Sequence, residues 1–160
     1  MTPPSPIPSP VSCHVRDPSA VYAVRTLVRS FAPAVGFDKE VTEELVVVVS
    51  ELASNIVKYG RRGTIELSAL DPAEGVTGIS IVAEDETPPF DLTGSLRDGY
   101  DSSGQIDPAR VFGRGGIGAG LGAVARFSDR LELVPVATGG KRIIARRAVS
   151  RPRRGSQPSF

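Results

Sequence analysis

The chain has 160 residues and a net charge of +1, and its composition is 40% hydrophobic and 23% charged. These values are typical of one globular domain with its own hydrophobic core. The near-neutral charge excludes strong electrostatic recruitment to nucleic acid or to a membrane surface, and no apolar run approaches the roughly 18 residues that a membrane-spanning helix needs. A single cysteine, Cys13, excludes an internal disulfide framework and fits a reducing compartment. We therefore expect a cytoplasmic protein that has neither a nucleic-acid nor a membrane partner.

The two ends of the chain differ in composition from the segment between them. Residues 1–10, MTPPSPIPSP, are half proline and lack the charged and apolar regions of a signal peptide. Residues 150–160 contain several arginines and no apolar run. We predict a proline-rich disordered tail at 1–10, a basic disordered tail at 150–160, and one folded domain over residues 11–149.

The folded segment begins with a candidate edge strand over residues 11–16. Asp17-Pro18 then combines a capping oxygen with a proline at the first helical position, which is a typical helix start. Apolar residues recur at spacings of three and four behind it, so an amphipathic helix is predicted over 18–33. Its expected buried face consists of Val21, Val24, Leu27, Val28 and Phe31.

A second helix is predicted over residues 39–59, with Asp38 as its cap and Gly60 and Gly63 at its end. Its β-branched run lowers helix propensity, so a buried strand over 45–50 is a competing prediction for that stretch alone. We favour the helix because the polar residues keep a helical period to the end of the segment. The expected buried stripe consists of Val41, Leu45, Val49, Leu52 and Ile56.

The remaining elements define the fold class. Strands are predicted over 64–70 and 78–84, a third helix from Gly120 to about Phe127, and a hairpin of strands over 131–136 and 142–149. Adjacent strands that follow paired helices are typical of an α+β fold. We expect a two-layer α/β sandwich, with helices on one face of a mostly antiparallel, mixed sheet.

The second helix also carries polar residues beside its apolar stripe. Glu51 and Asn55 are one turn apart, and Lys58 projects close to the same line. They are either a solvated helix face or groups that point into a cleft. In a cleft, the carboxylate of Glu51 could act as a general base and the amide oxygen of Asn55 could bind Mg²⁺. Spacing alone does not decide between the two interpretations.

Two further segments have more than one interpretation. Asp85 ends a predicted strand and precedes a Thr-Pro-Pro turn, so it either starts the turn or accepts a hydrogen bond from an amine such as that of adenine. Residues 113–122, GRGGIGAGLG, hold six glycines. Because glycine is costly to order, this run is a linker, a tight turn or a loop whose backbone must come close to a ligand.

Taken in order, SELASNIVKYG, IVAED, DGYDSSG and GIGAGLGAVARFSD resemble motifs of the GHKL ATPase superfamily, the Bergerat fold. Within that superfamily the chain is most similar to the small anti-sigma-factor and stressosome switch serine/threonine kinases. The resemblance covers about residues 35–147 and implies the cofactors ATP and Mg²⁺ and a glycine-rich ATP lid.

The resemblance also implies roles for individual residues. Glu51 matches the general base, Asn55 the Mg²⁺ ligand and Asp85 the aspartate that binds the adenine amine. Glycines let backbone N–H groups approach a polyphosphate, and the start of a helix adds a positive dipole end. The other residues expected to bind ATP are Lys58, Thr87, Gly115, Gly116, Ile117, Gly118, Gly120, Leu121 and Lys141.

The chain departs from the family pattern at the base end of the site. The family has Asp-x-Gly-x-Gly, whereas Thr87 and Pro89 stand here in place of the two glycines. Lys141 stands where the family has a threonine, and we expect it either to reach a phosphate or to face solvent. The segment before the glycines is roughly ten residues longer than in the family.

The resemblance implies a kinase that phosphorylates serine or threonine on a STAS-domain partner, either a stressosome component or an anti-anti-sigma factor. A PP2C-type phosphatase or a sigma factor is a further expected partner, and a homodimer is left open. The alternative is a pseudokinase scaffold that binds nucleotide weakly and acts by holding its partner. Retention of Glu51 favours the kinase, because a scaffold needs no base.

Overall fold

The computed structural model describes residues 3, 6–96, 100–101, 104–105 and 117–149. The predicted basic tail, most of the predicted insertion, and Gly115 and Gly116 lie outside these residues. The main strands are β1 (Val11–Val15), β2 (Gly63–Ala69), β3 (Gly78–Asp85), β6 (Arg130–Pro135) and β7 (Lys141–Ala148). The main helices are α1 (Ser19–Val35), α2 (Lys39–Tyr59) and α5 (Ile117–Arg126).

The strands form a five-stranded sheet in the order β1-β2-β3-β7-β6. All four neighbouring pairs in this sheet are antiparallel, so the prediction of a mixed sheet was wrong in that respect. Strand β3 lies between β2 and β7, and its last residue, Asp85, is directly opposite Lys141 at the start of β7. The register of this central pair therefore places a carboxylate next to an ammonium group at one end of the sheet.

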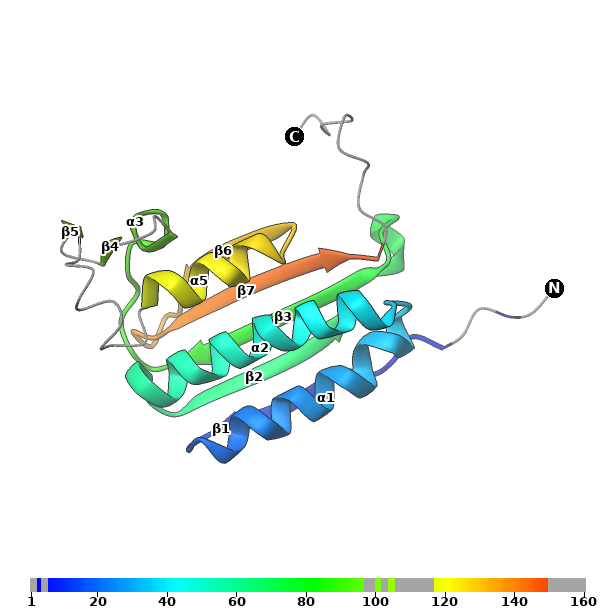
Figure 1. Cartoon of the computed structure of the whole chain (residues 1–160), viewed down its shortest axis with the longest axis horizontal. Helices are drawn as coiled ribbons and strands as arrows, with labels where there is room; N and C mark the ends of the chain where they lie inside the picture. Colours follow the sequence, from blue (N-terminus) through cyan, green and yellow to red (C-terminus); the bar gives the residue numbers. More distant parts are fainter. Residues whose placement is uncertain (1–2, 4–5, 97–99, 102–103, 106–116, 150–160) are drawn as a thin grey trace.

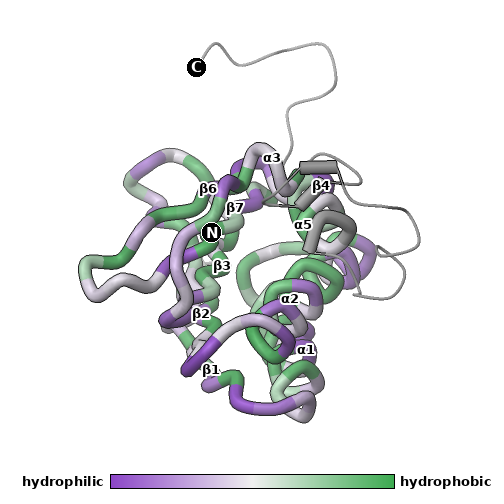
Figure 2. The backbone as a smooth tube through the Cα atoms, turned by 90° about the vertical axis from the view of Figure 1, so that its left-hand side faces the viewer, coloured by the Kyte–Doolittle hydropathy of each residue, from purple (hydrophilic) through white to green (hydrophobic). Residues whose placement is uncertain are grey.

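The helices lie on one face of the sheet, as the α+β prediction required. Figure 1 shows α2 between α1 and α5, with the sheet behind all three helices, and Figure 2 shows the sheet and the helices side by side as two layers. The buried apolar residues form a single cluster between the layers, and it includes Val24, Leu45, Leu52, Ile81 and Leu121. None of the helices in the described part of the chain has the length and apolar character needed to cross a membrane.

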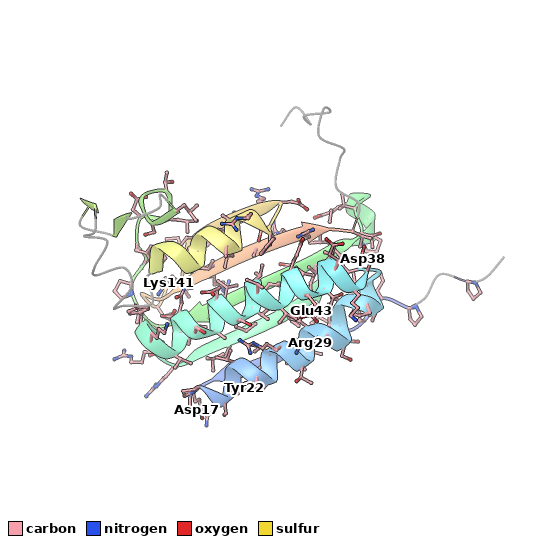
Figure 3. The ribbon with its side chains drawn as sticks, viewed as in Figure 1. Asp17, Tyr22, Arg29, Asp38, Glu43 and Lys141 are labelled. Carbon is pink, nitrogen blue, oxygen red and sulfur yellow. The ribbon has the colours of Figure 1, made fainter. Side chains whose placement is uncertain are left out.

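The first two helices are fixed by their ends and by a pair of charges between them. Asp38 Oδ1 accepts a hydrogen bond from Val41 N at 2.8 Å, which confirms the predicted cap of α2. Helix α1 runs two residues beyond the predicted end, and Gly36 ends it with a φ of 120° that favours glycine. Arg29 of α1 bonds Glu43 of α2 on the outer surface (Figure 3), and this hydrogen bond lowers the pKa of Glu43.

The structure differs from the prediction in several boundaries. Helix α5 begins at Ile117, three residues before the expected Gly120. Gly63 begins β2 instead of ending α2, and a Cβ on it would lie 2.2 Å from Ile56 Cγ2. Sequence analysis missed four small elements, namely the 3₁₀ helix Pro72–Glu74, the helix α3 (Leu92–Leu96), and the paired strands β4 (Tyr100–Asp101) and β5 (Gly104–Gln105).

Candidate nucleotide site between α2, α5 and the ends of β3 and β7

The polar pair of α2 faces the first turns of α5. A Cβ placed on Gly120 would lie 2.5 Å from Glu51 Oε2 and 3.9 Å from Asn55 Oδ1. The chain thus brings the Glu51–Asn55 motif and the glycine run together, although about sixty residues separate them in sequence. This arrangement favours the cleft interpretation over a fully solvated helix face, and both side chains are half-buried.

The close approach explains a glycine inside a helix. Glycine in a helix interior costs about 1 kcal/mol relative to alanine, so a helix that contains Gly118, Gly120 and Gly122 needs a compensating reason. At Gly120 the reason is steric, because any side chain would occupy the space of the Glu51 carboxylate. Leu121, the next residue, is fully buried in the core and fixes this side of α5 against α2.

With the base role that the resemblance implies for Glu51, Gly120→Ala is expected to reduce phosphoryl transfer by about ten- to a hundredfold with no loss of thermal stability. The added methyl group displaces only the end of the Glu51 side chain, while alanine raises helix propensity by about 1 kcal/mol. A carboxylate moved by about 1 Å loses most of its efficiency as a positioned base. Kinase assays and thermal unfolding of the same preparation measure the two effects. Full activity in the variant would show that Glu51 does not need its present position.

The other end of the site is built on the sheet. Asp85 ends β3 and is 8% exposed, and Lys141 starts β7 and is 7% exposed. Lys141 Nζ lies 3.1 Å from each carboxylate oxygen of Asp85. The Thr87 backbone N–H donates to Asp85 Oδ1 at 2.7 Å, and the Thr87 hydroxyl bonds both Asp85 and Lys141. Asp85 therefore starts the turn, as one interpretation predicted, and its oxygens are bonded within the protein.

The structure corrects the prediction that Lys141 reaches a phosphate or faces solvent. The lysine side chain neither faces solvent nor points toward the phosphate end, but is buried against Asp85, Thr87 and the ring of Phe90, whose centroid is 5.8 Å from Nζ. Figure 3 places it at the end of the molecule where α2 and β3 finish. The physical reason is the β3–β7 register, which pairs Lys141 with Asp85, and the low cost of a buried ammonium that has an ionic partner.

A cavity of about 40 Å³ adjoins this pair. Asn55, Asp85 and Lys141 line it together with apolar and small residues, which are Leu52, Ile56, Tyr59, Gly60, Ala83 and Ile143. Ligand pockets usually measure roughly 300–1,000 Å³, so this space holds about one water molecule and no purine base. The base end of the site therefore does not fit adenine in this conformation, whereas the lining residues do join Asn55 to Asp85.

Two glycines hold the backbone tightly around Asp85. A Cβ on Gly140 would lie 2.4 Å from the Asp85 carbonyl oxygen, and one on Gly60 would lie 3.2 Å from Asp85 Cγ and 2.9 Å from the Ile56 oxygen. Gly60 adopts an extended conformation, with φ −85°, so close approach and not a left-handed turn explains the glycine. These contacts could not be predicted from local sequence, because they depend on how β7 and α2 meet β3.

The remaining predicted site residues have different places. Lys58 is exposed on the last turn of α2. Ile117 and Gly118 belong to the first turn of α5, whose start also contains Gly120, so this helix N-terminus lies beside Glu51 and Asn55. The sequence analysis did not predict that Tyr59 lines the cavity or that Phe90 packs against Lys141. The only local signal was that each aromatic residue lies close to a motif in sequence.

The phosphate and metal end fits the groups that the resemblance implies. The amide oxygen of Asn55 is a hard ligand of the type that Mg²⁺ accepts, and Mg²⁺ usually completes its shell with water and phosphate oxygens. The described residues contain no cluster of three His, Cys, Asp or Glu that could hold a metal by itself. Asn55 would therefore share the ion with a bound nucleotide.

Comparison with known sequences identifies a family and a relative. The model of the histidine kinase-like ATPase domain matches residues 15–147. The chain belongs to this family. It is also 33% identical over 126 residues to "Serine/threonine-protein kinase RsbT" of Bacillus subtilis strain 168, a match that covers 78% of this chain and 86% of that protein. Within the family the chain is a serine/threonine protein kinase.

Two solved structures share the fold of this family member. The SiaB–SiaC complex from Pseudomonas aeruginosa matches with a TM-score of 0.59 and 15% identity, covering 89% of this chain and 90% of that chain. The RsbU and RsbW domains of Rv1364c from Mycobacterium tuberculosis match with a TM-score of 0.55 and 18% identity. That match covers 94% of this chain and 35% of the longer mycobacterial chain.

Proposed function

We propose that the chain binds Mg²⁺·ATP between α2 and α5 and phosphorylates a serine or threonine of a STAS-domain partner in a stress or sigma-factor pathway. The observation that carries the proposal is the contact of Gly120 with Glu51 and Asn55, which joins a base, a metal ligand and a helix N-terminus in one place. The kinase relative supports the reaction type.

Each residue has a defined task in this proposal. When bound, Mg²⁺·ATP supplies the phosphoryl group. Glu51 accepts the proton of the target hydroxyl, because its carboxylate lies at the α2–α5 contact and forms no salt bridge with any described residue. Asn55 holds the metal, and the first backbone N–H groups of α5 face the phosphates. Phosphoryl transfer needs positioning and charge neutralisation above all, so this small set of groups is sufficient.

The partner belongs to the same proposal. One solved neighbour is a complex of SiaB with SiaC, and the other joins RsbU and RsbW domains in one protein, so both proteins combine this fold with a second component. We propose that this chain acts on a STAS-domain protein, and that a PP2C-type phosphatase or a sigma factor takes part in the pathway. A cytoplasmic location and the remaining ATP contacts, at Lys58, Thr87, Gly115, Gly116, Ile117, Gly118 and Gly120, are part of the proposal. The predicted contact at Leu121 is not, because this side chain is fully buried in the core.

Transfer of labelled phosphate from ATP to a STAS-domain protein of the same organism tests the proposal directly. The assay contains the full chain, Mg²⁺ and the candidate partner, and mass spectrometry identifies the modified hydroxyl. Phosphate on a serine or threonine of the partner, absent when Mg²⁺ is chelated, is the expected result. Binding of the partner without any transfer under these conditions would support the scaffold function in its place.

Asn55→Ala is expected to remove the contribution of Mg²⁺ to ATP binding, which calorimetry with and without Mg²⁺ measures. In the wild-type chain, Mg²⁺ should tighten ATP binding by about tenfold or more, since metal ligands and their supports are typically worth 10–100-fold in affinity. In the variant, the two titrations should agree within about threefold. Ser54→Ala, the same kind of truncation at the preceding position, is the control. An undiminished Mg²⁺ effect in Asn55→Ala would exclude Asn55 as the metal ligand.

A further inference from the structure

The carboxylate of Asp85 is the only buried acid at the base end of the described site, and both of its oxygens already have partners. Both of its oxygens lie 3.1 Å from Lys141 Nζ, and Oδ1 also accepts from the Thr87 backbone. Lys141 in turn bonds the Thr87 hydroxyl and lies 3.5 Å from the Thr87 carbonyl oxygen. No buried polar side-chain atom among the described residues lacks a partner, so nothing here awaits a ligand.

An amine from a nucleobase would have to use the same carboxylate oxygens. Lys141 Nζ and an exocyclic amine are both N–H donors, and an ionic donor held at 3.1 Å is a strong competitor for a carboxylate. The space beside the pair measures about 40 Å³, which is too small for the ring that would carry the amine. The charge of Lys141 and the small space beside it therefore both oppose binding of a nucleobase at Asp85.

We propose that Lys141 is an internal competitor of the nucleobase, so that base recognition by Asp85 occurs only when the lysine side chain leaves the carboxylate. This inference rests on the proposed nucleotide site and adds a determinant of its affinity and base selectivity. The apparent affinity for ATP in this binding mode is the intrinsic affinity multiplied by the fraction of molecules in which Lys141 has left the carboxylate. While Lys141 stays, Asp85 cannot distinguish adenine from a purine that has no amine.

The test measures this discrimination with two nucleotides. Calorimetry compares ATP with purine riboside 5′-triphosphate, which has hydrogen in place of the 6-amino group, each with Mg²⁺ and the full chain. In the wild type, the two dissociation constants should agree within about threefold. In Lys141→Thr, ATP should bind tighter than in the wild type and be preferred over the analogue by about tenfold or more, because a hydrogen bond to a charged group is then gained.

Two further variants keep the test interpretable. Lys141→Thr leaves a buried carboxylate without its cation, which destabilises a protein, so thermal unfolding of each variant is recorded first. Asp85→Asn/Lys141→Thr removes both charges and keeps an amide oxygen for the base amine, and we expect it to prefer ATP as well. Lys39→Thr makes the same substitution at an exposed position of α2 and should behave as the wild type.

The possible results separate the two proposals. An ATP preference that appears only after Lys141 is replaced supports the competition. If the preference for ATP over the analogue is the same in the wild type and in both Lys141 variants, the competition is refuted, whereas the nucleotide site is not. A wild-type chain that already prefers ATP by tenfold would also refute the competition. Absence of binding of either triphosphate to every variant would refute the nucleotide site itself, and the competition with it.

Discussion

Glu51→Gln is expected to slow phosphoryl transfer by about 10²- to 10⁴-fold, which is the usual contribution of a positioned general base. Glutamine has the same shape as glutamate and can stay beside Gly120, but its amide cannot take up the proton of the target hydroxyl. Nucleotide binding should be retained, because Asn55 and the start of α5 are unchanged. Labelled-phosphate transfer to the partner measures the rate, and calorimetry measures the binding.

Glu40→Gln is the matched control, since it makes the same change at an exposed position in the first turn of the same helix. It should leave the transfer rate within about twofold of the wild type, because exposed positions far from a site contribute little. A Glu51→Gln variant with wild-type rates would refute the assignment of Glu51 as the base. Loss of nucleotide binding in that variant would instead show that Glu51 helps to bind the nucleotide or the metal ion.

Arg147→Met is expected to lower the free energy of unfolding by about 1–3 kcal/mol, the cost of leaving partly buried polar groups without their partner. This is less than the roughly 3–5 kcal/mol of a fully buried ion pair broken from one side, because the Glu44 side chain is 28% exposed. The Arg147 side chain is 7% exposed, bonds Glu44 of α2, and donates to the carbonyl oxygen of Phe127, just after α5, at 3.0 Å. Methionine leaves the Glu44 carboxylate and this carbonyl without their donor. Denaturant unfolding monitored by circular dichroism measures the loss.

A double variant and a neighbouring control define this effect. Glu44→Leu/Arg147→Met removes both charges and should recover much of the stability, because apolar replacement of a buried pair is often neutral. Arg146→Met changes the adjacent residue, whose partner Glu132 lies 3.4 Å away on the more exposed side of the sheet, and should cost at most about 1 kcal/mol. Equal losses from Arg146→Met and Arg147→Met would contradict a special role for the buried pair.

Local signals in the sequence predicted most of the framework. The helical spacing of apolar residues located α1 and α2, and the side chain of Asp38 caps α2 as expected. The strands of the main sheet were predicted within two residues of their observed bounds. These features depend on periodicity and on single end residues, both of which are visible without knowledge of the tertiary structure.

The start of α5 was not predictable on the same basis. Glycine has low helix propensity, so propensity places the start after the glycine run, near Gly120. The structure begins the helix at Ile117, because packing of α5 on α2 determines its length and needs a residue without a side chain beside Glu51. In this case tertiary contact overrides local preference, at the residue where the two proposed catalytic segments meet.

The environment of Lys141 required information that no short segment contains. Its partner Asp85 is 56 residues earlier, and the two meet only through the antiparallel register of β3 with β7. The family resemblance predicted that this position belongs to the base end, which agrees with the cavity that it lines. The resemblance did not predict the burial of Lys141. The family has a threonine at this position, and a threonine cannot form the ion pair with Asp85 that holds the lysine inside.

The tight fit of Gly140 on the Asp85 carbonyl oxygen has a consequence for how such a site can evolve. The backbone on both sides of the pair is fixed by this fit and by the strand ladder, so the identity of one side chain decides whether the carboxylate is covered. Lysine and threonine codons differ by a single nucleotide. One point mutation could therefore change the nucleotide selectivity of the kinase while the hairpin, the sheet and the rest of the site stay as they are.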